Sequence, residues 1–171
     1  ILLLEKIVTE TVSIVIGSES DLDLANKCAD ALDSLSISNS IQVLSAHRTP
    51  GLLETHVREC ESGGTKVFVA MAGLAAHLAG AVASKTVLPV IGVPGDGGPL
   101  SGMDALLSTV QMPKGIPVAT VAIGSAGATN AAYLAAQILG VESEEVRSSL
   151  LKVREEGVEA IKESNKKLSD S

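Results

Sequence analysis

Short apolar runs recur along the chain and mark the expected positions of strands. Five of these runs lack a strict alternation of apolar and polar residues, which is typical of strands covered by helices on both faces of a sheet. We therefore predict five parallel strands at residues 12–16, 41–44, 67–72, 87–93 and 118–123.

Helical periodicity occupies the intervals between these runs. Apolar residues recur at three- and four-residue spacing in two segments, which contain Leu24, Cys28, Ala31 and Leu35, and then Leu53, Val57 and Cys60. In the second segment, Thr49 supplies an N-cap and Pro50 a first-turn proline, and residues 63–64 (Gly-Gly) end the helix. Ser20, with Asp23 three residues later, is predicted to cap the first helix.

Strands that alternate with helices predict a three-layer α/β/α fold. Crossovers between parallel strands are right-handed, and we expect a flavodoxin-like, doubly wound parallel sheet of about five strands. The chain 1–171 is expected to form one domain, with a core at about 12–140 and a long C-terminal helix at about 142–168. A narrow apolar stripe on that helix either lies on its own domain or contacts another subunit: Val146, Leu150, Val153, Ile161 and Leu168.

Composition narrows the range of functions. Apolar residues make up 46% of the chain but include one Phe and one Tyr, so we expect an aliphatic core. A net charge of -7 argues against broad nucleic-acid binding, which needs clustered Lys and Arg. Cys28 and Cys60 lack metal-ligand spacing and are expected to be buried free thiols. The apolar run at residues 1–4 is too short for a signal sequence or a membrane span, so we expect a cytoplasmic protein.

Polar clusters follow each of the first three predicted strands. They occupy residues 17–21 (Gly-Ser-Glu-Ser-Asp), 45–49 (Ser-Ala-His-Arg-Thr) and 73–77 (Gly-Leu-Ala-Ala-His). In an open parallel sheet, ligands bind beyond the carboxyl ends of the strands, at the point where the strand order reverses. We therefore expect the three clusters to converge on one crevice between the first and third strands.

The second cluster points most directly to catalysis. His47 belongs to the residue type best suited to carry protons near neutral pH, and Arg48 beside it adds a fixed cation. The first cluster is either a seat for a phosphate or ribose or an ordinary helix cap. His77 in the third cluster either contacts a ligand or caps the next helix.

Other polar residues have less definite interpretations. His56 flanks the apolar face of the second predicted helix, next to Val57, and is expected to be structural. Asp96 and Asp104 lie in or near the glycine-rich stretch 95–98, which is either a lid over the crevice or a surface connection.

The polar clusters resemble signature motifs of the PurE family. Residues 45–50 are similar to the family's S-A-H-R-T-P signature, and residues 17–21 to its G-S-x-S-D loop. Four further segments resemble PurE segments in the same order along the chain: 75–78, 88–94, 111–113 and 126–132. The resemblance runs from about Val12 to Gly140 and is far more specific than any single motif.

Two classes of this family differ in their chemistry, and the chain resembles class I. Class I rearranges N5-carboxyaminoimidazole ribonucleotide, whereas class II carboxylates aminoimidazole ribonucleotide directly with carbon dioxide. Class II members typically carry S-A-H-K and lack the later histidine, whereas Arg48 and His77 are both present here. The chain departs from class I at three places. Leu74 stands where the family usually has glycine, and Ala79 where it has proline. Residues 95–96 (Gly-Asp) lie where the family has less glycine. These departures bear on loop fit and substrate affinity more than on the reaction type.

The resemblance implies a mutase of purine biosynthesis that acts on a small nucleotide without a cofactor or metal. It implies that His47 is the catalytic acid and base. It implies twelve substrate-binding positions: Gly17, Ser18, Ser20, Asp21, Ser45, Ala46, Arg48, Gly73, Leu74, Ala75, His77 and Leu78. It further implies a homo-octamer with active sites shared between subunits, and neither nucleic acid nor membrane is expected as a partner.

Two alternative functions share the predicted architecture. One is direct carboxylation of aminoimidazole ribonucleotide, as in class II. The other is a non-enzymatic flavodoxin-like nucleotide-binding module, such as an FMN carrier or a receiver domain. The two aromatic residues, Phe68 and Tyr133, offer little surface for stacking on a flavin. Asp21 stands nearly alone after the first strand, whereas a receiver domain needs clustered acids for magnesium.

Overall fold

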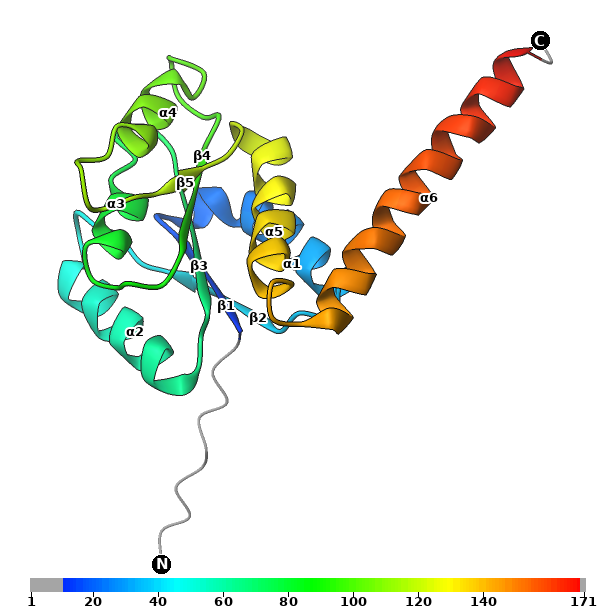
Figure 1. Cartoon of the computed structure of the whole chain (residues 1–171). Helices are drawn as coiled ribbons and strands as arrows, with labels where there is room; N and C mark the ends of the chain where they lie inside the picture. The colour runs from blue at the N-terminus through cyan, green and yellow to red at the C-terminus, as the bar shows by residue number, and fades with distance from the viewer. Residues whose placement is uncertain (1–10, 170–171) are drawn as a thin grey trace, which may run out of the picture.

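A five-stranded parallel sheet lies between two layers of helices in the computed structural model of the chain, which describes residues 11–169 (Figure 1). The apolar run at residues 1–4 lies outside this range. The strands and helices occur in the following order along the chain: β1 (Val12–Ile16), the short 3-10 helix η1 (Glu19–Asp21), α1 (Leu22–Ser34), β2 (Asn39–Val43), α2 (Pro50–Gly63), β3 (Val67–Ala72), α3 (Leu78–Ala83), β4 (Val90–Pro94), α4 (Met103–Val110), β5 (Ala119–Thr120), α5 (Gly124–Leu139) and α6 (Glu144–Ser169).

The strand order is β2-β1-β3-β4-β5, which confirms the predicted flavodoxin-like topology. β1 pairs with β2 on one side and β3 on the other, and in this register Ile14 lies opposite both Ile41 and Val69. The chain therefore runs from β1 to β2 on one side of the sheet and then crosses back over β1 to add β3, β4 and β5 on the other side. This reversal leaves the carboxyl ends of β1 and β3 beside each other as the expected ligand site.

Alternate residues of the strands build two separate cores. Ile14 and its neighbours on one face of the sheet pack against α1 and α5, whereas Val15 and Phe68 on the other face pack against α2 and α3. α4 covers the second face as well, since the Thr109 side chain lies directly over Gly92 of β4. The cores are aliphatic, as the composition predicts, and the buried Phe68 contributes the largest fully buried side chain.

The strand predictions needed correction at the sheet edges and at the start of β4. β1, β3 and β4 are almost wholly buried, but the edge strands β2 and β5 are partly exposed and therefore not covered on both faces. The predicted strand at 87–93 begins only at Val90, and Val87 is 100% exposed. Pro89 has no N–H to donate to a sheet, although its carbonyl accepts from Phe68 N–H at 3.0 Å.

The predicted cap of the first helix was wrong, whereas the bounds of the second were confirmed. α1 begins after η1, and the Ser20 hydroxyl bonds Ser18 instead of the helix backbone. α2 begins at Pro50 and ends at Gly63, and its C-cap Gly64 has a φ of 109°, the left-handed conformation that glycine adopts readily. Thr49 is the N-cap by position, but its hydroxyl bonds Ser45 and caps no α2 amide.

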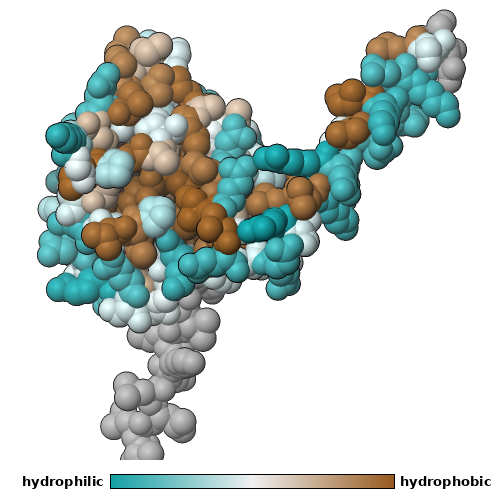
Figure 2. Space-filling model, in the orientation of Figure 1, coloured by the Kyte–Doolittle hydropathy of each residue, from teal (hydrophilic) through white to brown (hydrophobic). Residues whose placement is uncertain are grey.

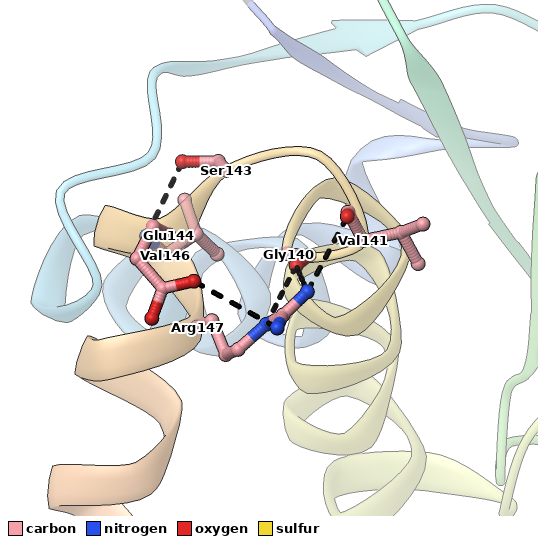
Figure 3. Close-up of polar contacts among 6 residues, drawn as sticks. All are labelled: Gly140, Val141, Ser143, Glu144, Val146 and Arg147. Carbon is pink, nitrogen blue, oxygen red and sulfur yellow. Dashed lines mark hydrogen bonds and ion pairs between the residues drawn. The ribbon is translucent and has the colours of Figure 1, made fainter.

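A polar corner joins α5 to α6 (Figure 3). The Arg147 guanidinium donates to the Gly140 carbonyl at 3.2 Å and to the Val141 carbonyl at 3.4 Å, which satisfies acceptors left open at the end of α5. Ser143 Oγ accepts from Val146 N–H at 3.3 Å at the start of α6. These bonds fix the direction in which α6 leaves the body of the molecule.

The apolar stripe of α6 is packed against the core in the first part of the helix and exposed in the last part. Val146, Leu150 and Val153 are partly buried against the core, whereas Ile161 and Leu168 are exposed on the part of the helix that projects from the body (Figure 1). Figure 2 shows apolar side chains among hydrophilic ones on this projecting part. Despite its length, α6 is too polar to cross a membrane, and the other helices of residues 11–169 do not qualify either.

Candidate active site

A cleft of about 860 Å³ opens beyond the carboxyl ends of β1, β3 and β4. It is lined by all thirteen residues that the sequence analysis singles out for catalysis or binding: Gly17, Ser18, Ser20, Asp21, Ser45, Ala46, His47, Arg48, Gly73, Leu74, Ala75, His77 and Leu78. The predicted convergence of three polar clusters on one crevice is therefore present in the structure. The individual roles of these residues in binding and catalysis stay predictions.

The first cluster forms a compact set of hydroxyls around a carboxylate. Ser18 Oγ bonds Ser20 Oγ and donates to Asp21 Oδ2 at 3.5 Å, and Asp21 N–H donates to the Ser18 carbonyl at 3.1 Å. Partial burial raises the pKa of the Asp21 carboxyl, and the hydrogen bonds from Ser18 oppose that rise. The cluster presents hydroxyl oxygens and a carboxylate, which suit the hydroxyls of a ribose.

The second cluster holds Arg48 across the mouth of the cleft. Ser45 Oγ accepts from Arg48 N–H at 3.1 Å and lies 3.4 Å from Arg48 Nε. The far end of the guanidinium reaches the other loop, where Nη2 donates to the Gly17 carbonyl at 3.2 Å. Arg48 therefore ties the loop after β2 to the loop after β1 and places a fixed positive charge beside Ser18.

The two cleft histidines contact each other. His47 Nε2 lies 3.0 Å from His77 Nδ1, and the rings meet edge to face with centroids 4.9 Å apart. His77 Nδ1 is also 3.0 Å from the Ala75 carbonyl. A hydrogen on His77 Nδ1 can be shared between the Ala75 carbonyl, which can only accept, and Nε2 of a neutral His47; a protonated His47 carries hydrogen on Nε2 and does not accept there. His77 is the N-cap of α3 by position, but its side chain makes no cap bond and turns to His47 instead.

Further cleft residues come from distant parts of the chain and were not predicted from the sequence. Lys27 on α1 donates to Ser125 Oγ at the start of α5, at 2.7 Å, and both residues line the cleft with Asp23. No local pattern pairs Lys27 with Ser125. Asp96 also lines the cleft, and its carboxylate lies against Gly124, whereas Asp104 is absent from the lining.

His56 and the two cysteines lie in the protein interior, away from the cleft. His56 Nε2 bonds Ser13 Oγ at 2.9 Å and lies 3.4 Å from Cys60 Sγ, and burial lowers the His56 pKa. Burial raises the pKa of the Cys60 thiol and brings that of Cys28 to about 12. These groups are held in their neutral forms, which agrees with the structural interpretation of His56 and the free thiols. Within residues 11–169, no group of three or more His, Cys, Asp or Glu residues is arranged to hold a metal ion.

Comparison with known proteins identifies the family. The family model described as AIR carboxylase matches residues 11–160, which is most of the chain. This chain belongs to the AIR carboxylase family. The N5-carboxyaminoimidazole ribonucleotide mutase of Pseudomonas aeruginosa is 49% identical to it over 150 residues, which cover 88% of this chain and 92% of that protein. The protein with the same name from Bacillus subtilis is 47% identical over 157 residues, or 92% of this chain and 97% of that protein.

A solved structure of the AIR carboxylase family has the same fold. The crystal structure of Treponema denticola PurE superimposes with a TM-score of 0.84 at 31% identity and covers 92% of this chain and 97% of that one. The similarity therefore extends beyond the sheet and includes most of the described helices.

The departures from the PurE pattern fit this fold locally. Ala79, in place of proline, lies in the first turn of α3 and is buried near Gly92, where a first-turn proline is also accommodated. Leu74, in place of glycine, has a φ of 54°, a left-handed conformation that explains the usual glycine. The glycine-rich stretch 95–98 lines the cleft, so it is more than a remote surface connection.

Proposed function

We propose that this chain is an N5-carboxyaminoimidazole ribonucleotide mutase of purine biosynthesis, the activity named for relatives 47–49% identical to it. The observation that carries the proposal is the pairing of His47 with His77 at the mouth of the cleft. Arg48 and the first polar cluster, which contains Ser18, Ser20 and Asp21, line the same cleft as this pair. A proton carrier is thereby placed next to groups suited to a phosphorylated ribose.

Arg48, Ser18, Ser20 and Asp21 bind the ribose phosphate end in this proposal. The Arg48 guanidinium has donors in a planar fork that suits phosphate oxygens, and its bond to the Gly17 carbonyl fixes its orientation. Hydroxyls of Ser18 and Ser20 can donate to phosphate, and Asp21 accepts from ribose hydroxyls. The imidazole ring of the substrate then lies toward His47 and the segment 73–78.

The first chemical step breaks the bond between the exocyclic nitrogen and the carboxylate carbon. The bonding electrons stay on nitrogen, carbon dioxide departs, and protonated His47 gives its proton to that nitrogen. The product is a neutral amine on an electron-rich imidazole ring. A positioned histidine contributes to such proton transfers because its ordinary pKa lies near the working pH.

The second step forms the new carbon–carbon bond. Ring carbon C4 attacks the carbon dioxide, which becomes a carboxylate, and neutral His47 then removes the hydrogen from C4 and restores the aromatic ring. The proton that His47 gave in the first step thus returns to it in the second. Atoms and charge balance without a cofactor.

Retention of carbon dioxide between the steps depends on the lining of the cleft. The segment around the histidines supplies small and apolar groups from Ala46, Gly73, Ala75 and Leu78. Such groups offer the gas little competition from bound water and keep it beside the ring, which raises its effective concentration.

We further propose that the protein works in the cytoplasm as a homo-oligomer, with an octamer as the specific form. Support comes from apolar residues that the single chain leaves exposed on the loop and helix around α4: Leu100, Met103, Leu107 and Val110. Val158 and Ile161 on the projecting part of α6 are similarly exposed. Clustered apolar side chains on a surface are typical of subunit contacts.

Isotope labelling tests the proposed reaction. The carboxyamino substrate is incubated with the protein in ¹³C-bicarbonate equilibrated with carbonic anhydrase, and product is analysed by mass spectrometry. We expect fast conversion and an unlabelled product carboxylate, because the carbon dioxide is recaptured before it escapes. Product that forms only from aminoimidazole ribonucleotide and carries the label would instead establish direct carboxylation. Failure to form product from either substrate would refute both reactions.

A further inference from the structure

Leu74 occupies a backbone conformation that leucine seldom adopts. Its φ is 54°, and its side chain is 55% exposed although it lines the cleft. A left-handed conformation is costly for a residue with a bulky side chain and persists where the surroundings hold it. The position of the Leu74 side chain therefore calls for a contact that compensates for the backbone.

That contact is with Gly98, in the loop between β4 and α4. A Cβ atom added to Gly98 would lie 2.5 Å from Leu74 Cδ2, so the leucine methyl group fills the space that any larger residue at 98 would need. Gly98 itself has a φ of 86°, another left-handed conformation. The leucine after β3 and the glycine after β4 are thus fitted to each other.

The same two loops also touch at their bases. Gly95 N–H donates to the Ala72 carbonyl at 2.9 Å, and a Cβ atom on Gly95 would lie 3.2 Å from Gly73 Cα. Beyond this base, residues 96–101 are exposed, and those from Asp96 to Gly98 line the cleft. Leu74 therefore meets the loop at its exposed part, where backbone contacts with the sheet have ended.

We propose that Leu74 is a positioning residue that holds residues 96–101 at the mouth of the cleft through its contact with Gly98. The proposal rests on the function proposed above, because the loop is taken to border the bound substrate. The contact joins two loops at the mouth of the cleft and does not involve His47, so it affects substrate binding and leaves the chemistry at His47 unchanged.

Two variants separate this role from a merely structural one. Leu74→Gly is expected to raise KM about tenfold with kcat within about twofold, because uniform binding is lost. Its melting temperature is expected to stay the same or rise, since glycine adopts a φ of 54° easily. Leu74→Met keeps a long apolar side chain that can reach Gly98, so its KM should lie well below that of Leu74→Gly. Leu74→Gly with an unchanged KM, or with KM and stability lost together, would overturn the proposal.

A double-mutant cycle tests the contact itself. Gly98→Ala introduces the same backbone strain in either background, but its methyl group collides with Leu74 only in the wild-type background. We expect it to raise KM about tenfold with Leu74 present and about twofold in the Leu74→Gly protein. Equal effects in the two backgrounds would show that the residues act independently and would overturn the proposal.

Hydrogen–deuterium exchange gives a readout that does not depend on the reaction. In the protein without substrate, the Ser101 amide, which donates to the Gly98 carbonyl at 3.3 Å, should exchange faster in Leu74→Gly than in wild type, while the amides of β1 and β3 stay unchanged. Unchanged exchange at Ser101 would overturn the proposal even if the wild-type enzyme is active. A wild type that lacks mutase activity but shows the exchange difference would refute the proposed function and leave the Leu74–Gly98 contact supported.

Discussion

Two histidines near the start of α2 have opposite surroundings. His47 lies in the loop before the helix, is exposed, and meets His77 across the cleft. His56 lies within the helix, is half-buried, and bonds Ser13 of β1. Both make a side-chain hydrogen bond of about the same length.

The difference shows that the position of a histidine relative to the sheet decides what its side chain can do. His47 follows β2 beyond its carboxyl end, where the strand order reverses and the backbone leaves room for a ligand. His56 contacts Ser13 near the beginning of β1, inside a packed core where burial favours the neutral imidazole. The same side chain is thus suited to proton transfer in one place and to packing in the other.

Replacement of His47 is expected to have the largest effect, and that effect is on kcat. His47→Asn should lower kcat by at least about 100-fold, because an amide cannot carry the proton between nitrogen and carbon. The fold should be kept, since the side chain is exposed at the mouth of the cleft. Turnover is measured from product absorbance, with circular dichroism to confirm folding. His56→Asn is the matched control and should keep kcat within about twofold; near-normal turnover in His47→Asn would refute the proton-transfer role.

Changes at His77 should have an intermediate effect. His77→Ala removes the group that orients His47, and we expect kcat to fall about tenfold, which corresponds to one hydrogen bond. His77→Asn should recover part of that loss because its amide nitrogen lies near the place of Nδ1 and can donate to His47. Equal losses in the two variants would contradict an orienting hydrogen bond through Nδ1.

The fold was largely predictable because apolar runs and helical spacing are local signals. β1 and β3 lie where the sequence analysis places them, and residues 63–64 do end α2. The start of β4 was not predictable from apolarity alone, because Val87 and Leu88 belong to a turn in which Thr86 Oγ1 accepts from Leu88 N–H. The course of α6 could not be predicted either, since its apolar stripe resumes beyond Gly157 and includes both the packed Val153 and the exposed Ile161.

The site was predictable where the topology brings strand ends together and unpredictable where side chains reach across. The rule for open parallel sheets is sufficient to place Ser18, His47 and His77 in one crevice. It gives no information on the bond between Lys27 and Ser125, which lie 98 residues apart, or on the contact of Leu74 with Gly98. Such pairs depend on the exact spacing of helices and loops, which no local pattern records.

His56 should affect stability where His47 affects turnover. His56→Asn removes a partly buried bond to Ser13, and we expect the free energy of unfolding to fall by about 1 kcal/mol. Chemical denaturation of both single variants measures this at one pH. A His47→Asn protein destabilised as much as His56→Asn would contradict the contrast between an exposed and a packed histidine.

The pH dependence of stability should give the smallest difference, because His56 is only half-buried. Burial lowers its pKa in the folded protein, so between that value and the ordinary value near 6.5 the unfolded chain binds more protons than the folded chain. Stability should therefore be fully present above about pH 6.5 and decline as pH falls toward the lower folded-state pKa. Denaturation curves of wild type and His56→Asn, measured between about pH 7.5 and 5, isolate this contribution because the other titrating groups are common to both proteins. A difference that grows at lower pH in favour of wild type would have the wrong sign and would contradict a packed, neutral His56.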